Sequence, residues 1–224
     1  MKELISGLDE KTQSVLNYYV FCNKLKNVMR KGWQDWGVKR ERLESVAEHI
    51  YGVQMLAIAM RSEFGYGVNI EKVLKMLAVH EIEEIIIGDL TLFDIDSETK
   101  LKIGHDAVQK ILSPLIDGEE YIKLITEFDE RQTPEAKFAY HCDKLEADLQ
   151  ARMYDLEGCM KKVKLYKNKR YKESPDVRNL LNSGLSWGQM WLKFGWMRYN
   201  YDENFLAVSK FAYENDILRN FNKK

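Results

Sequence analysis

The sequence predicts an all-α protein. Apolar residues recur at helical spacing over several long stretches, and the 224 residues include only three prolines. A hydrophobic content of 45% and a charged content of 31% are typical of a soluble globular chain. The net charge of −1 argues against partners such as nucleic acid or an anionic membrane. Neither a signal-peptide pattern nor a long apolar run is found, so we expect a cytoplasmic location.

Six helices are expected before residue 160, each from apolar residues at helical spacing: residues 9–30, 43–64, 70–87, 98–113, 119–130 and 134–157. Asn69 and Ser97 stand where N-caps belong, and Thr133 followed by Pro134 is a typical helix start. Residues 30–37 are expected to form a glycine-broken loop with cations and two indoles. That composition suits the binding of an anion beside a ring. It is also typical of a helix C-terminus, where Lys and Arg interact favourably with the helix dipole and tryptophans pack beneath them.

The composition changes towards the C-terminus. Residues 160–174 are rich in lysine and carry no apolar period, so they are expected to form a solvated connector. Residues 187–199 contain three tryptophans, which predicts a segment packed on the helical body or on a partner subunit, with a ligand-covering role as the alternative. The predicted division is therefore a domain at 1–174 and a helical extension at 175–224. The three cysteines are expected to be reduced thiols.

Residues 78–91 combine one histidine and four carboxylates with apolar residues at helical spacing: His80, Glu81, Glu83, Glu84 and Asp89. Two interpretations stay open. The acidic residues could form a solvated face beside one hydrogen-bonded core histidine. Alternatively, several of the charged groups lie at the edge of the core, where buried carboxylates need a proton, a cation or a metal.

Two other helices supply comparable residues. His49 lies inside the apolar run of the second helix, and Asp143 lies beside the apolar face of the sixth. Alone, His49 would more often be a hydrogen-bonded core residue, and Asp143 would pair with Lys144 or another cation. Taken together with His80 and Glu81, they are ligand types that suit a divalent transition metal.

The ordered set of motifs resembles the HD-domain metal-dependent phosphohydrolases, whose signature is a histidine, a later His-Asp doublet and a distal aspartate. Within them it is most similar to the branch that removes phosphate from deoxyribonucleoside 5′-monophosphates. The matching segments lie between residues 15 and 157: residues 25–33, 44–49, 78–81, 84 with 88–91, 135–138 and 143–146. The chain departs from the pattern at Glu81, where the family usually has Asp, so the carboxylate arm is one methylene longer.

The resemblance implies an HD-type helical bundle that binds one divalent metal, Mn²⁺, Co²⁺ or a similar ion, through His49, His80, Glu81 and Asp143. Arg30 would then bind the phosphate, and Trp33 would line the nucleoside pocket. Glu84 would orient the attacking water or carry its proton, and Asp89 would contact the sugar hydroxyls or assist proton transfer. A homodimer with a small nucleotide substrate is expected.

Two alternatives to this reaction follow from the same residues. Loops choose the substrate within one fold, so the enzyme could act on another small phosphorylated metabolite. The longer carboxylate at Glu81 and the aromatic C-terminal segment are also compatible with a catalytically silent HD-like module that binds a nucleotide or a protein.

Overall fold

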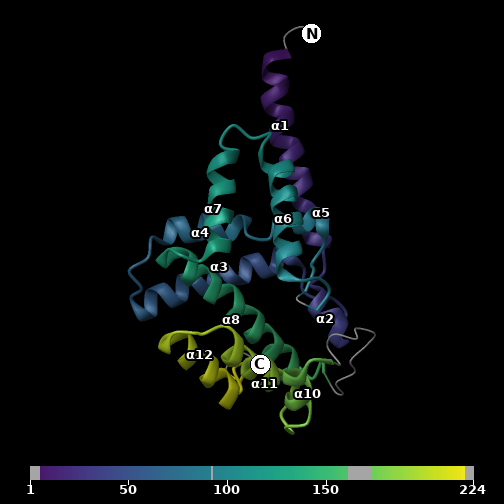
Figure 1. Cartoon of the computed structure of the whole chain (residues 1–224), viewed down its shortest axis with the longest axis vertical. Helices are drawn as coiled ribbons and strands as arrows, with labels where there is room; N and C mark the ends of the chain where they lie inside the picture. Colours follow the sequence, from purple (N-terminus) through teal and green to yellow (C-terminus); the bar gives the residue numbers. More distant parts are fainter. Residues whose placement is uncertain (1–5, 92, 161–172, 220–224) are drawn as a thin grey trace.

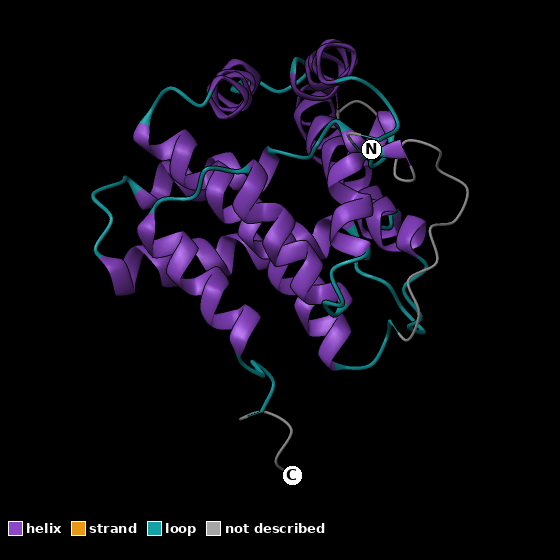
Figure 2. Cartoon of the chain, turned by 60° about the horizontal axis from the view of Figure 1, so that its bottom comes forward, coloured by secondary structure: helices purple, strands orange, loops and turns teal. Residues whose placement is uncertain are grey.

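The computed structural model describes residues 6–91, 93–160 and 173–219, and within them the chain is helical with no strand (Figures 1 and 2). This confirms the all-α prediction. The elements are α1 Ser6–Cys22, η1 Asn23–Asn27 (a 3-10 helix), α2 Lys31–Trp36, α3 Val46–Phe64, α4 Ile70–Val79, α5 Glu84–Ile87, α6 Ser97–Leu112, α7 Gly118–Glu130, α8 Pro134–Leu156, α10 Pro175–Leu181, α11 Trp187–Arg198 and α12 Glu203–Glu214. None of the described helices is both long and apolar enough to cross a membrane.

Several predicted helix starts agree with the caps in the structure. The side chains of Asn69 and Thr133 accept hydrogen bonds from the first turns of α4 and α8. One cap was assigned wrongly, because Asp96 rather than Ser97 caps α6 by accepting from the backbone N–H of Thr99. Such a carboxylate also interacts favourably with the helix dipole.

The first predicted helix and the loop after it are wrong in detail. Instead of one helix over residues 9–30, α1 ends at Cys22 and is followed by η1, because the chain then pairs with the start of α3. Val46 donates to the carbonyl of Val28 at 2.8 Å, and Arg30 donates to the carbonyl of Glu44 at 3.0 Å. The predicted loop at 30–37 contains the short helix α2, which Gly37 ends in the left-handed conformation at φ 71°.

The third predicted helix, 70–87, is interrupted at the histidine-carboxylate doublet. Helix α4 ends at Val79, residues 80–83 form a turn, and α5 begins at Glu84. The backbone hydrogen bonds there join residues three apart, as from Ile82 to Val79 at 3.1 Å, so the helix tightens locally. Local periodicity cannot reveal this change, because the apolar residues keep their spacing through the turn.

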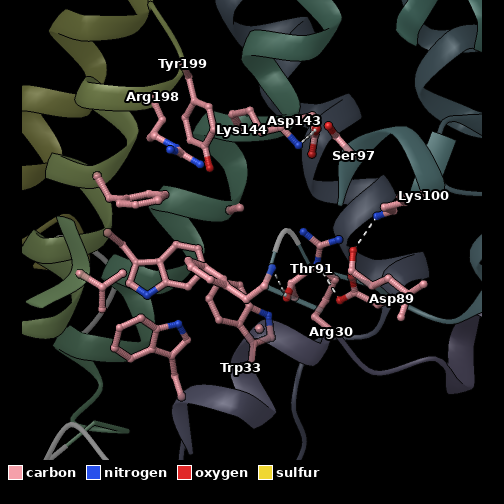
Figure 3. Close-up of a pocket in the computed structure, with 18 of the residues that line it drawn as sticks. Arg30, Trp33, Asp89, Thr91, Ser97, Lys100, Asp143, Lys144, Arg198 and Tyr199 are labelled. Carbon is pink, nitrogen blue, oxygen red and sulfur yellow. Dashed lines mark hydrogen bonds and ion pairs between the residues drawn. The ribbon is translucent and has the colours of Figure 1, made fainter. Parts of the chain in front are cut away.

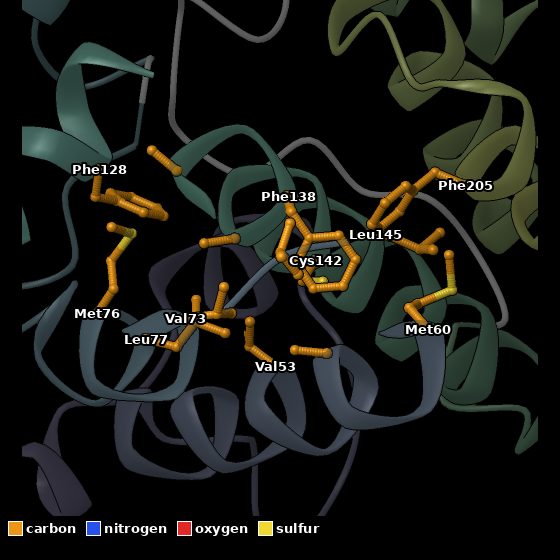
Figure 4. Close-up of a cluster of buried hydrophobic side chains, with 14 of the residues drawn as sticks. Val53, Met60, Val73, Met76, Leu77, Phe128, Phe138, Cys142, Leu145 and Phe205 are labelled. Carbon is orange, nitrogen blue, oxygen red and sulfur yellow. The ribbon is translucent and has the colours of Figure 1, made fainter. Parts of the chain in front are cut away.

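Helix α8 is the central element of the fold, and α3, α4, α7, α11 and α12 all pack against it. The main core lies between α3, α4 and α8, with Phe205 of α12 at its edge (Figure 4). Val53, Leu77 and Leu145 are completely buried there. Burial of these apolar side chains stabilises the packed helices. The close packing also fixes the positions of His49, His80 and Asp143, which lie on or next to these helices.

Helix α11 lies close against α8. A methyl group added at Gly188 would come within 2.8 Å of the Arg152 Cα atom, and one added at Gly195 would overlap the carboxylate of Asp148. Only glycine permits these backbones to approach so closely. The division at residue 174 stays a prediction, and residues 161–172 of the predicted connector lie outside the described residues.

Candidate metal centre and pocket

The four predicted metal ligands meet at one point in the structure. His49 comes from α3, His80 and Glu81 from the turn after α4, and Asp143 from α8. One donor atom from each lies within 4.8 Å of the others. His49 Nε2 is 3.0 Å from Asp143 Oδ1, and His80 Nε2 is 3.8 Å from Glu81 Oε1 and 3.9 Å from Asp143 Oδ1. Two imidazole nitrogens and two carboxylates form a donor set that suits a divalent transition metal.

The two histidines present their Nε2 atoms to this point. The Nδ1 atom of His80 lies 2.8 Å from the Leu77 carbonyl oxygen, which is an acceptor only, so Nδ1 carries the proton. Nε2 of His80 is buried and has no hydrogen-bond partner in the described part of the chain. Buried polar atoms are normally paired, so an unpaired lone pair facing carboxylates fits a metal ligand. These four residues therefore fit the divalent metal ion that the sequence predicts.

The interpretation of residues 81–84 as a solvated acidic face is wrong. Glu81 is 9% exposed and Glu84 is 1% exposed. Burial and the neighbouring Glu81 raise the pKa of Glu84 well above its ordinary value. Burial also opposes ionisation of Glu81, but the side chains of Glu84, His80 and Arg30 outweigh it and lower the pKa of Glu81. The pKa values of these two neighbouring carboxyls are therefore shifted in opposite directions.

Glu146 is a residue of the centre that sequence reasoning did not single out. Its Oε2 atom lies 2.6 Å from His49 Nδ1, so the carboxylate orients the imidazole with Nε2 towards Asp143. Burial and Arg30 lower the pKa of His49, but the adjacent Glu146 and Asp143 outweigh them and raise it to about 10. The available signal was position, since Glu146 lies three residues after Asp143 and shares its helix face.

Cations stand beside the carboxylates. Arg30 lies 3.5 Å from Glu81 and 4.0 Å from Asp89. Asp89 also accepts a hydrogen bond of 2.6 Å from the backbone N–H of Lys31, so it anchors the start of α2. Lys100 of α6 lies 3.6 Å from Glu84 and donates to the Leu90 carbonyl at 2.7 Å.

Asp143 faces the other candidate ligands and also pairs with Lys144, the cation considered from the sequence. Its Oδ1 atom faces His49 and its Oδ2 atom pairs with Lys144 at 2.7 Å. Burial alone would raise the pKa of Asp143, but Lys144 and the two histidines lower it well below its ordinary value. The carboxylate is therefore ionised and available to a cation.

A pocket of about 820 Å³ opens beside this centre (Figure 3). Its polar end contains Arg30, Glu81, Glu84, Asp89, Lys100 and Asp143. Its other walls are largely aromatic and aliphatic, which is typical of a site for a small organic ligand. The pocket is large enough for a small organic ligand, and two of the four converging residues, Glu81 and Asp143, line it.

Trp33 lines this pocket but is deeply buried, at 1% exposure. Its indole N–H donates to Glu44 Oε2 at 2.7 Å, and burial with the nearby Glu146 raises the pKa of Glu44 to about 7. The ring centre of Trp33 lies 5.0 Å from that of Trp191 of α11. The aromatic C-terminal segment therefore forms part of the pocket wall, and sequence reasoning had left that role as the alternative.

Several known proteins are similar to this chain in sequence. A family model described as "HD domain" matches residues 22–182. The 5′-deoxynucleotidase HDDC2 of Dictyostelium discoideum is 33% identical over 148 residues, which cover 62% of this chain and 77% of that protein. The 5′-deoxynucleotidase HDDC2 of Danio rerio is 33% identical over 149 residues, covering 65% of this chain and 72% of its own length.

Solved structures are similar as well. A conserved hypothetical protein from Pyrococcus furiosus matches with a TM-score of 0.57 and 30% identity, over 65% of this chain and 85% of its own. A predicted metal-dependent phosphohydrolase from Magnetospirillum magnetotacticum matches with a TM-score of 0.62 and 20% identity, over 95% of this chain and 98% of its own. At 20% identity, the match to the Magnetospirillum magnetotacticum protein shows a similar fold only.

Proposed function

Because the chain belongs to the HD domain family, we propose that it is a metal-dependent phosphomonoesterase that hydrolyses nucleoside 5′-monophosphates, deoxyribonucleotides among them, to nucleoside and phosphate. The family resemblance seen in the sequence is confirmed. One structural observation carries the proposal: the Nε2 atom of His80, which has no hydrogen-bond partner among the described residues, lies among His49, Glu81 and Asp143. Glu81, Asp143 and the nearby Arg30 line a pocket of about 820 Å³. The relatives named 5′-deoxynucleotidase give the substrate class.

In this proposal His49, His80, Glu81 and Asp143 hold one divalent ion, with Mn²⁺ or Co²⁺ as the expected identity. The ion would supply a Lewis acid that lowers the pKa of water and offsets phosphate charge. Imidazoles with carboxylates are ligands that these metals accept, and the structure has both types within reach of one point. Glu146 keeps the His49 ring in the orientation that this role requires.

The remaining polar residues bind the phosphate and move the proton. Arg30 presents a planar guanidinium that suits two-pronged binding of a phosphate monoester, and Glu81 and Asp89 hold it at the edge of the centre. Lys100 adds a second cation at this end. We assign Glu84 to orienting the attacking water or carrying its proton. Asp89 is assigned to the sugar hydroxyls or to proton transfer, in addition to its contact with Arg30.

Oligomeric state and location belong to the same proposal. Helix α1 extends beyond the rest of the helical body in Figure 1 and exposes apolar side chains: Val15, Leu16, Tyr19 and Val20, which are 55–64% exposed. An apolar face of this kind favours a homodimer. All three cysteines are unpaired, which supports the cytoplasmic location expected from the sequence.

Phosphate release by metal-stripped protein tests the function. Mn²⁺, Co²⁺, Mg²⁺ or Zn²⁺ is added back, and the substrates are deoxy- and ribonucleoside monophosphates with sugar phosphates alongside. We expect metal-dependent release from the nucleotides, because the donor set and the relatives agree. His80→Ala should reduce release to background, whereas His105→Ala should not, because His105 pairs with Asp129 on α7 outside the centre.

Glu81→Asp, assayed in parallel, tests the longer carboxylate. Turnover by the native protein would show that the His-Glu doublet supports the chemistry. Turnover by Glu81→Asp without turnover by the native protein would mean that the extra methylene of Glu81 prevents the reaction. Release that is independent of metal, or unchanged in His80→Ala, would contradict the proposal, and binding without turnover in both proteins would favour a nucleotide-binding module.

A further inference from the structure

Helix α11 has two functional faces. Gly188, Leu192 and Gly195 follow each other at helical spacing, and all three are buried, with the two glycines against α8. Trp191, Phe194 and Arg198 recur at intervals of three and four residues on another face, and all three line the pocket. Packing on α8 therefore accounts for the first face, but not for the second.

The second face is placed to meet the part of a ligand farthest from its phosphate. Figure 3 shows Arg198 on one side of the pocket and Arg30, Asp89 and Lys100 on the other. The Trp191 ring packs on Trp33 beside the start of α2, since a methyl group added at Gly32 would lie 3.7 Å from it. A nucleotide whose phosphate occupies the polar end would thus place its base beside α11.

This face offers hydrogen-bond donors and rings. The Arg198 guanidinium carries only donors, and it lies over the Phe194 ring at 5.3 Å from the ring centre. The Nε1 atom of Trp191, also a donor only, is buried and has no acceptor among residues 6–91, 93–160 and 173–219. No carboxylate of α11 lines the pocket, since the helix contains none. A base that presents acceptors is complementary to such a wall.

Arg198 differs from the other cations of the pocket. Arg30, Lys100 and Lys144 each pair with a carboxylate of the metal centre or its surroundings. For Arg198, no carboxylate of the described residues lies within ion-pair distance. Its guanidinium is therefore free to bind a ligand without first breaking an ion pair, while the Phe194 ring limits its conformations.

We propose that the Trp191, Phe194 and Arg198 face of α11 is the nucleobase subsite of this pocket, and that Arg198 selects guanine over adenine. The inference rests on the proposed function for its ligand class. Guanine offers two adjacent acceptors, O6 and N7, to the paired donors of arginine, whereas adenine replaces O6 with an amino group that is itself a donor. The family model ends at residue 182, before α11 begins.

The first experiment measures binding of 2′-deoxyguanosine and 2′-deoxyadenosine to the metal-loaded protein by calorimetry, because nucleosides carry no phosphate to be hydrolysed. We expect deoxyguanosine to bind about 5- to 20-fold more tightly, the low end of what an arginine-guanine pair supplies, because Arg198 is exposed to solvent. Arg198→Gln should bring the ratio close to one. Arg198→Lys should recover only part of it, since lysine lacks the two-pronged donor geometry.

Lys193→Gln is the matched control, because Lys193 is a cation of the same helix that does not line the pocket. It should keep the native ratio. Equal binding of the two nucleosides by the native protein, or a ratio that Arg198→Gln leaves unchanged, overturns the inference. If Lys193→Gln also lost the preference for deoxyguanosine, the inference would be overturned, because the preference would then depend on net charge rather than on Arg198.

The second experiment separates this inference from the proposed function. Values of kcat/KM are measured for dGMP, dAMP and 2-deoxyribose 5-phosphate, which shares the phosphate and sugar but has no base. Arg198→Gln should lower kcat/KM for dGMP through KM and leave 2-deoxyribose 5-phosphate unchanged. Hydrolysis of both nucleotides with equal kcat/KM refutes the guanine preference and keeps the function. A guanine preference in binding with no hydrolysis supports the subsite and refutes the function.

Discussion

Gly52 tests the link between helix packing and the candidate metal centre, because it is not itself one of the four candidate ligands. It lies on α3, three residues after His49, and the carboxylate of Glu146 occupies the space where a side chain would be. A methyl group there would overlap Glu146 Oε1 and lie 3.1 Å from its Cδ atom. In Gly52→Ala the carboxylate is expected to move, because it is the flexible end of a side chain while both helix backbones are packed. The hydrogen bond to His49 Nδ1, 2.6 Å in the native protein, is then lost.

Two opposing terms set the size of the effect. Alanine in a helix interior stabilises the fold by about 1 kcal/mol relative to glycine. Loss of a hydrogen bond to a charged group costs about 1.5–3 kcal/mol, so the metal-free protein should lose about 0.5–2 kcal/mol and still fold. Loss of a carboxylate that orients a metal-ligating histidine lowers metal affinity about 10- to 100-fold, or about 1.4–2.7 kcal/mol.

Calorimetric titration of Mn²⁺ into metal-stripped protein measures this effect. Gly67→Ala is the matched control, because nothing lies within 4 Å of a methyl group added at Gly67. A double-mutant cycle with Glu146→Ala identifies the route: if Gly52→Ala acts through Glu146, the double variant should bind Mn²⁺ no more weakly than Glu146→Ala alone. A Kd for Gly52→Ala within twofold of the native value, or additive losses in the double variant, would refute the reasoning.

Two other predictions concern stability and assembly. Burial raises the pKa of Asp148 well above its ordinary value, so the folded state keeps a proton that the unfolded chain releases near pH 4, and stability contributed by that proton is lost as pH rises. Asp148→Asn should therefore raise the melting temperature at pH 8 by about 2–4 °C and have less effect near pH 4; an equal shift at both pH values would argue against a titrating carboxyl. Leu16→Glu, on the exposed face of α1, should convert a dimer to monomers in size-exclusion chromatography with light scattering; a native protein that is already monomeric would contradict the proposed homodimer.

The sequence by itself determined the helical class, because apolar spacing, N-caps and helix breakers act within a few residues of each other. Asn69, Thr133 and Pro134 begin helices for local reasons, and the structure agrees. The convergence of His49, His80, Glu81 and Asp143 was also predictable, since residue types and their order matched a family pattern. Their roles as ligands stay a proposal.

Contacts between distant segments decided the rest. The His49–Glu146 hydrogen bond and the place of Lys100 beside Glu84 each join parts of the chain that no local pattern relates. The sequence of the aromatic segment at residues 187–199 predicted that this segment packs against another surface, but not which surface. Only when Gly188 and Gly195 let α11 approach α8 does its other face line the pocket, because the orientation of a helix depends on which surfaces meet.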